Sequence, residues 1–242
     1  MYLRFGQVVG QAGILHAILI VLLAKTITTL TALSLSAIAT NTRVKGGGAY
    51  FLISRSLGVE YGGAIGVVFY LAQAVSVAMY VIGFSEALVA LLPGLGLSVR
   101  EAASVVSTGV FATVFIGAGW AIRVQYAILA LLAVSLLSFF LGALGHLDAG
   151  VFEANLGPAY LEGEGFFVAF ALFFPAATGI MAGANLSGDL KDPGRSIPRG
   201  TLGAILVTGL VYLALAVTLG GTASRDVLRA EPLVMEDIAL SG

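Results

Sequence analysis

The chain has 242 residues, of which 59% are hydrophobic and only 10% are charged, and its formal net charge at pH 7 is −1. Its mean hydropathy is +1.02. Soluble domains carry about 25% charged residues, so this composition excludes a soluble globular protein. The absence of cysteine excludes disulfides and thiolate chemistry, and no basic arm indicates a nucleic-acid partner. We therefore expect an all-α membrane protein whose surroundings are the lipid bilayer.

Apolar stretches long enough to cross a bilayer, about 20 residues at about 1.5 Å each, recur along the whole chain. They are a half-span at 1–13 and spans near 16–39, 62–92, 100–119, 120–142, 165–190 and 200–222. Loops on one side carry seven Lys and Arg residues and those on the other side three. The side with more of these residues is predicted to be cytoplasmic.

The sixth span is interrupted by the sequence FALFFPAATGIMAG at residues 170–183. Pro175 removes a backbone N–H, and Gly179 and Gly183 let the backbone leave helical geometry at low cost. Non-helical backbone at membrane depth is tolerated where it faces protein or a water-filled cavity. Two half-helices would present bare carbonyls to a cation and bare N–H groups to an anion, as at the midplane sites of transporters. A simple kink or a Gly-xxx-Gly packing face is the alternative.

The third predicted span carries one polar stripe at helical spacing, made of Gln73, Ser76 and Tyr80. Ordinary hydrogen bonds between helices explain Gln73 and Ser76. The phenol oxygen of Tyr80 could bind a cation if it faces the interrupted span. In the second span, Lys25 is either a buried counter-ion or a side chain that snorkels to the interface.

The sequence has no acidic residue between Glu60 and Glu86, or between Glu164 and Asp189. A cation bound near Pro175 would therefore be surrounded by neutral dipoles alone. Since an uncompensated charge at that depth is costly, a co-bound anion would offset it. The residues by themselves thus favour paired transport of a cation and an anion.

An intramembrane enzyme would need a pair of Asp residues, a Ser–His pair or a metal cluster inside the spans, and the sequence has none there. We expect no enzyme activity, no catalytic residue and no cofactor. A channel would need a continuous pore, whereas a single occluded break favours alternating access. An amino-acid or polyamine transporter remains the alternative.

Three stretches are more specific: VKGGGAYFLISRSLGVEYGG, VSVAMYVIGFSEAL and FFPAATGIMAGANLSGDLKDPGRSIPRGTL. They closely resemble the cation–chloride cotransporters, a family of the amino acid–polyamine–organocation superfamily, and the resemblance runs from Met1 to about Leu240. It implies a five-plus-five inverted-repeat fold with a discontinuous sixth helix. The implied function is secondary active symport of potassium and chloride across the plasma membrane. The motifs GGGAY and PAAT are most similar to the sodium–potassium–chloride branch.

The resemblance also implies site residues. The implied potassium ligands are Tyr80, the Pro175 carbonyl and the Thr178 hydroxyl, and the implied chloride ligands are the N–H groups of Gly179, Ile180 and Met181. Potassium would be the only metal bound. Arg4 and Glu86 are expected to pair as an extracellular gate, because both charges would be costly there unless paired.

Residues 1–242 are expected to form a single but incomplete transmembrane domain, from half of helix 1 through helix 7 to the start of the following loop. Family members have the unwound segment of helix 1 upstream of Met1 and a sodium-binding helix 8 downstream of Gly242. Sodium coupling is therefore left open, and the chain by itself is not expected to transport. A homodimer is compatible with the longer protein.

Overall fold

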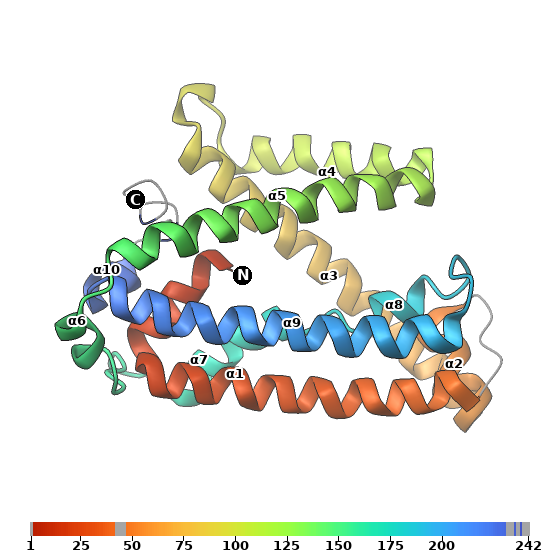
Figure 1. Cartoon of the computed structure of the whole chain (residues 1–242). Coiled ribbons are helices and arrows are strands. Elements are labelled where there is room, and N and C mark those ends of the chain that lie inside the picture. Colours follow the sequence, from red (N-terminus) through yellow and green to blue (C-terminus); the bar gives the residue numbers. More distant parts are fainter. Residues whose placement is uncertain (1, 42–46, 231–234, 236–237, 239–242) are drawn as a thin grey trace. The chain divides into compact units, whose positions relative to one another are not determined.

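The computed structural model describes residues 2–41, 47–230, 235 and 238, and the regular structure in this part of the chain is entirely helical. Six of its segments are long and apolar enough to cross a membrane. This confirms an all-α, multi-pass integral membrane protein. The elements are α1 (Tyr2–Asn41), α2 (Gly48–Leu57), α3 (Val59–Leu91), η1 (Pro93–Leu95), α4 (Val99–Ile116), α5 (Ala118–Gly145), α6 (Ala149–Ala154), α7 (Phe166–Phe173), η2 (Phe174–Ala177), α8 (Ala182–Asn185), α9 (Pro193–Thr222) and α10 (Arg225–Ala230) (Figure 1).

The chain forms two compact units, one made of Met1–Gly58 and Ser135–Gly242 and the other of Val59–Val134. In the second unit, α3 packs against α4 and reaches it through η1. Ser98 and Glu101 cap the start of α4 reciprocally, and the Ser98 N–H donates to Glu101 Oε2 at 2.8 Å. This capping box satisfies donors that the first turn of a helix leaves without partners.

The first unit is organised by a reversal of α1 at Gly13. Its φ of 68° and ψ of 172° lie outside helical geometry, and Figure 1 shows the helix turning back there. Tyr2 and Lys25, on opposite sides of Gly13 in the sequence, consequently meet the same residue of α9. The Tyr2 ring stacks on the Tyr212 ring at 5.0 Å, and Lys25 Nζ lies 5.9 Å from the centre of that ring.

Both helix ends at the reversal find hydrogen-bond partners far along the chain. The bonds run from Ile14 N to Asn155 O (2.8 Å), from Leu15 N to Leu156 O (3.2 Å), from Ala159 N to Gln11 O (2.9 Å) and from Arg225 Nη1 to Gly10 O (3.3 Å). They satisfy the terminal N–H and C=O groups that helices leave unpaired. A Cβ on Gly13 would lie 2.1 Å from Gly157 O, so the close approach of this loop also requires glycine.

Asn155 fastens the same loop to the end of α9. Its side chain is buried, and Nδ2 donates to Gly220 O at 2.8 Å and to Ala223 O at 2.9 Å. One amide thus satisfies two carbonyls at the end of a helix. We call this end of the first unit, which holds Gly13, residues 146–165 and α10, the reversal end.

The long part of α1 and α9 lie side by side and form the core of the first unit (Figure 1). Small residues let their backbones approach closely, as between membrane helices generally. Ala17 and Ala24 of α1 are fully buried. A Cβ on Gly220 of α9 would lie 2.3 Å from Ile14 Cγ1, so packing there depends on the missing side chain.

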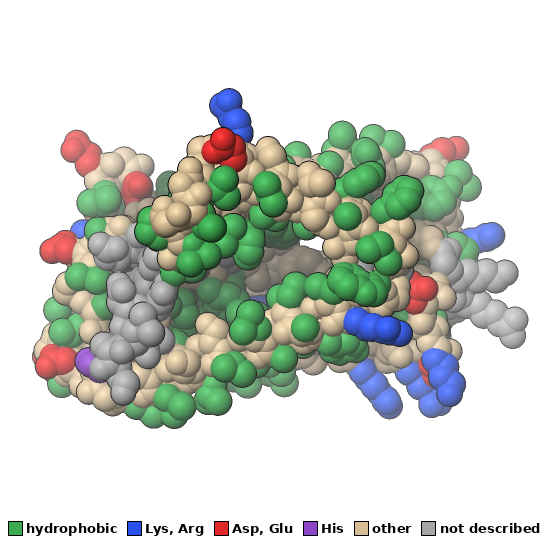
Figure 2. All heavy atoms as spheres, turned by 90° about the horizontal axis from the view of Figure 1, so that it is seen from above, with side chains coloured by type: hydrophobic (Ala, Val, Ile, Leu, Met, Phe, Trp, Pro, Cys, Tyr) green, Lys and Arg blue, Asp and Glu red, His purple; other side chains and the backbone are tan. Residues whose placement is uncertain are grey.

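Aromatic rings add a second layer to this core. The Tyr212 ring meets the ring of Phe5 at 5.2 Å and that of Phe173 at 5.0 Å, both edge to face. The outer part of α1, the end of α7 and α9 are thereby joined at one point. Figure 2 shows apolar side chains along the flanks of the helices, which is the surface that lipid requires.

At the opposite end of the first unit, α2 packs against α8. Gly48 has a φ of 57°, and a Cβ there would lie 2.7 Å from Asn185 Oδ1. Leu52, Ala184 and Ile197 join α2, α8 and α9 in a small buried cluster. We call this the basic end, because it carries Arg55, Lys191, Arg195 and Arg199.

The structure confirms the predicted half-span and spans within several residues, with one larger difference. The last span was expected near 200–222, but α9 begins at Pro193. The Asp192 carbonyl accepts hydrogen bonds from Arg195 N (3.3 Å) and Ser196 N (2.9 Å), and proline at the first helical position has no N–H to leave unpaired. The charge of Arg195 in this first turn lowers the local hydropathy, so the hydropathy pattern placed the start of the helix too late.

Replacing Gly13 by alanine should destabilise the protein. The positive φ alone costs about 1–3 kcal/mol for another residue, and the clash with Gly157 O adds to it. Gly203→Ala is the matched control, because a Cβ there meets nothing within 4 Å and the residue lies inside α9. Size-exclusion profiles of the detergent-extracted variants should show loss of the monodisperse peak for Gly13→Ala only. Equal behaviour of the two variants would contradict this account of the reversal.

Candidate functional site

The interrupted sixth span is a discontinuous helix, as predicted. α7 ends at Phe173, η2 continues to Ala177, and Thr178 is extended with φ −82° and ψ −177°. Gly179 follows with a φ of 94°, a conformation that favours glycine, and α8 begins only at Ala182. The simple kink is therefore wrong as an alternative, because Thr178 and Gly179 in succession leave helical geometry and separate two helical segments.

Pro175 and Thr178 lie together at the end of the first half-helix. The Pro175 carbonyl accepts the Thr178 hydroxyl at 2.7 Å and the Thr178 N–H at 3.3 Å. Since the hydroxyl proton is directed at Pro175, the lone pairs of Thr178 Oγ1 remain available to a cation. Both predicted oxygen ligands of this segment are thus adjacent.

The three residues that follow present donors. Among the residues that the structure describes, no acceptor lies on the backbone N–H groups of Gly179, Ile180 or Met181. Gly179 is exposed, and Ile180 and Met181 are half-buried. Unpaired N–H groups at membrane depth are expensive unless they face water or an anion, so this segment has the chemistry of an anion site.

A cavity of about 390 Å³ lies beside the break. Thr178, Gly179 and Ile180 line it on one side, α9 lines it between Ser196 and Thr208, and Lys25 of α1 completes it. No Asp or Glu is among the residues that line it, which agrees with the acid-free stretches of the sequence. Of the predicted ligands, Thr178, Gly179 and Ile180 line this cavity, whereas Pro175 and Met181 are not among its lining residues and Tyr80 belongs to the second unit.

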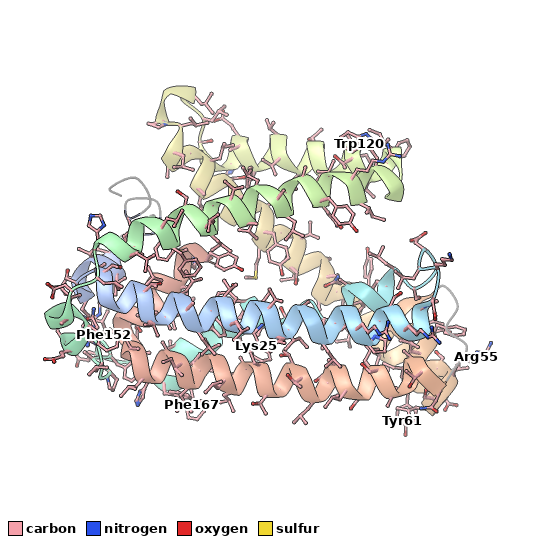
Figure 3. All side chains as sticks on the ribbon, in the orientation of Figure 1. Lys25, Arg55, Tyr61, Trp120, Phe152 and Phe167 are labelled. Atoms are coloured by element: carbon pink, nitrogen blue, oxygen red, sulfur yellow. The ribbon has the colours of Figure 1, made fainter. Side chains whose placement is uncertain are left out.

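Lys25 is the functional candidate that the sequence left undecided. Figure 3 shows it between α1 and α9. Its Nζ donates to Thr208 Oγ1 at 2.8 Å. A Cβ on Gly209 would lie 3.7–3.8 Å from Cγ, Cδ and Cε of the lysine, so the stem lies along the glycine. The ammonium therefore lines the cavity instead of snorkelling. The sequence around Lys25 could not predict this position, because it depends on Thr208 of α9.

The predicted gate residues, Arg4 and Glu86, and the predicted ligand Tyr80 lie on two helices, α1 and α3. Arg4, in the outer part of α1, lines a small hollow with Leu172 and Ala176. Tyr80 and Glu86 belong to α3 in the second unit, where helical rise separates them by about 9 Å. In the polar stripe of α3, Ser76 Oγ donates to the carbonyl of Ala72 at 2.8 Å, as an ordinary helical serine does.

Residues 1–235 match a protein family described as Amino acid permease. The chain belongs to this family. Over 245 residues it is 44% identical to solute carrier family 12 member 1 of Homo sapiens, covering 93% of this chain and 22% of the relative. It is 46% identical over 244 residues to member 2 of Homo sapiens, covering 93% of this chain and 20% of that relative.

A third relative, member 1 of Oryctolagus cuniculus, is 42% identical over 261 residues, which cover 100% of this chain and 23% of the relative. The chain thus spans about a fifth of the length of the curated relatives that it matches. These matches confirm the resemblance to the cation–chloride cotransporters and the superfamily. Permeases and solute carriers are transport proteins, and the chain is accordingly not an enzyme.

Gly179→Ala should strain the break directly. The φ of 94° makes alanine unfavourable by about 1–3 kcal/mol, although a Cβ would meet nothing within 4 Å. In the matched variant Gly183→Ala, the Cβ makes an ordinary 3.6 Å contact with Thr201 Oγ1 within helix α8, where alanine is favoured over glycine by up to about 1 kcal/mol. Melting temperatures of the purified variants should fall for the first and stay level or rise for the second. The reverse order would mean that Gly179 is not held in this geometry.

Proposed function

We propose that the chain supplies ion sites of a secondary active transporter that moves potassium together with chloride by alternating access. The observation that carries the proposal is the break of the sixth span, with two adjacent oxygens, three N–H groups that have no acceptor among the described residues, and a cavity with no carboxylate in its described lining. In this proposal, the break is the discontinuous sixth helix of the five-plus-five inverted-repeat fold that the family resemblance implies. Residues 1–242 act in it as one transmembrane domain.

Potassium is assigned to the oxygen side of the break. The Pro175 carbonyl and the Thr178 hydroxyl lie within one hydrogen bond of each other, and the C-terminal end of a half-helix carries partial negative charge. The phenol oxygen of Tyr80 on α3 is the proposed third ligand. All three are neutral, which suits a weakly hydrated monovalent ion that must leave again.

Chloride is assigned to the N–H side of the break, at Gly179, Ile180 and Met181. Neutral ligands alone would leave a cation uncompensated, at a cost of about 2.5–3.5 kcal/mol even on insertion scales. A chloride bound to the adjacent N–H groups offsets this charge. Coupling then follows from electrostatics, because each ion lowers the cost of binding the other.

The finer assignments belong to the same proposal. We place the protein in the plasma membrane, with potassium and chloride as its transported partners. The proposal allows sodium as a second transported cation and a homodimer as the assembled form. The ion sites described above depend on neither. The resemblance to the cotransporters supports all four statements.

Cation uptake should require chloride. The test is rubidium uptake into proteoliposomes that hold the chain together with any in-frame sequence that its gene encodes on either side. Replacing chloride by gluconate at constant ionic strength should abolish the uptake. Undiminished uptake in gluconate would refute coupling. Protein-free liposomes and valinomycin-treated liposomes report leak and vesicle integrity.

Tyr80→Phe and Thr178→Ala should each weaken the apparent affinity for rubidium. Each removes one neutral oxygen ligand, and a lost polar contact of about 0.5–1.5 kcal/mol corresponds to roughly 2–12-fold. Tyr70→Phe and Thr31→Ala are matched controls: Tyr70 is an exposed tyrosine of α3, and Thr31 is an exposed threonine whose hydroxyl bonds the Ile27 carbonyl at 3.0 Å. Unchanged affinity in both site variants would remove these residues from the cation site.

Arg4 and Glu86 are proposed to form an ion pair outside the ion sites. Opposite charges in a membrane protein stabilise one another when paired. Reversing either charge should abolish uptake, and the double variant Arg4→Glu with Glu86→Arg should restore a substantial part of it. Failure of the double variant to recover, with folding verified by size exclusion, would count against the pair.

A second candidate is an amino-acid or polyamine transporter, which the matched family description favours. The cavity of about 390 Å³ is large enough for a small organic ligand. Its N–H groups suit a carboxylate and its carbonyls an ammonium group. Amino acids or polyamines that compete with rubidium uptake, or that are themselves accumulated, would favour this candidate.

A further inference from the structure

Lys25 brings a full positive charge to the cavity. An ammonium group has three N–H donors. One bonds Thr208 Oγ1 at 2.8 Å, and the part of the chain that the structure describes supplies no acceptor for the other two. It likewise places no carboxylate within ion-pair distance of Lys25. A half-buried cation in this position needs a negative partner.

The ammonium is held in place by its neighbours. Thr208 Oγ1 accepts from Lys25 and donates to the Ala204 carbonyl at 2.7 Å, so its proton is directed away from the lysine. Gly209 leaves room for the stem, and the Tyr212 ring lies 5.9 Å from Nζ. This arrangement fixes the head group on the α9 side of the cavity, as a preorganised ligand requires.

The threonines of α9 differ in where their hydroxyl protons are directed. Hydroxyls of Thr208, Thr218 and Thr222 on α9 all donate to carbonyls one turn back. Thr201, by contrast, has no such bond within the described residues, although it lines the cavity. Its Oγ1 lies near Gly183, at 3.6 Å from the position of a Cβ there. Its proton is therefore available to a ligand.

These groups lie on a different wall from the break. Thr201 and Thr208 are separated by about 10 Å of helical rise along α9, and the cavity continues to Ser196 near the basic end. Gly179 and Ile180 of the break also line the cavity. The cavity therefore offers two separate sets of donors, of which only one carries a formal charge.

We infer that Lys25 is the charged ligand of a second anion site, on the wall formed by α1 and α9, which takes a small inorganic monovalent anion such as chloride. The Thr208 hydroxyl oxygen positions the ammonium. The inference rests on the proposed function in one respect, namely that an inorganic anion enters this cavity. It adds a site to that function and does not depend on cation coupling.

The test is chloride binding, measured without any transport step. The melting temperature of the purified protein is followed in mixtures of choline chloride and choline gluconate, because a ligand of the native state stabilises it according to its concentration and affinity. Lys25→Gln should raise the half-saturating chloride concentration by about tenfold or more, since hydrogen bonds to charged groups are the stronger ones. Lys25→Arg keeps the charge and should stay within about threefold.

Lys191→Gln is the matched control, because Lys191 is exposed and does not line the cavity. It should leave the half-saturating concentration unchanged. If Lys25→Gln does not fold, Thr208→Val is read instead, because it removes the oxygen that holds the ammonium, with an expected rise of about 2–12-fold for one lost hydrogen bond. A chloride response in Lys25→Gln, or in Thr208→Val in that case, that equals the native one overturns the inference.

The outcomes separate this inference from the proposed function. Lys25-dependent chloride binding in a protein without chloride-coupled rubidium uptake would refute the symport and leave the second site standing. Chloride-coupled uptake with an unaltered chloride response in Lys25→Gln would do the opposite. Loss of the chloride response in Gly179→Ala but not in Lys25→Gln would assign the anion to the break alone and overturn the second site.

Discussion

In the hydrocarbon of a membrane, every backbone N–H and C=O group needs a hydrogen-bond partner, and this requirement governs the structure of the first unit. Its spans leave helical geometry at two places, at Gly13 and at Thr178 and Gly179, and the neighbouring backbone groups differ in whether they have partners. At Gly13, carbonyls and N–H groups on both sides are capped by residues 155–159 and by Arg225. In the sixth span, three successive N–H groups have no acceptor in the described part of the chain. The break at Gly13 is thus capped by protein groups, whereas the break in the sixth span leaves its N–H groups without acceptors among the described residues.

Electrostatics in the cavity follows from the same distinction. Thr178 and Pro175 offer oxygens, while the N–H groups and Lys25 offer donors, and no carboxylate lines the space. Such a cavity has more capacity for negative than for positive charge. A cation is favoured there together with an anion, and Lys25 increases the anion capacity without itself being transported. Gly209 contributes to this arrangement by packing, since the lysine stem lies within ordinary contact distance of a Cβ position there.

Local patterns in the sequence predicted most of the helices, because apolar length and Pro and Gly positions are local signals. The discontinuity around Pro175 was predicted for this reason, and so was a boundary after residue 13. The hydrogen-bond partners at that boundary could not be predicted, because Asn155 and Arg225 are distant from it in sequence. The role of Lys25 also depended on a distant element, because Thr208 decides where its head group lies. Positions of the ion ligands relative to Tyr80 remain predictions from the family resemblance.

The sealed reversal at Gly13 has a consequence for biosynthesis. Its hydrogen-bond partners are made long after the helices that need them, roughly 7–30 s later at typical elongation rates of about 5–20 residues per second. Until residues 155–159 leave the ribosome, the carbonyl of Gln11 and the N–H groups of Ile14 and Leu15 lack their final partners. Water at the membrane surface is the available substitute. The turn must therefore stay at the interface until this loop is made, and its bond from Arg225 to the Gly10 carbonyl forms only after α9 has also been made.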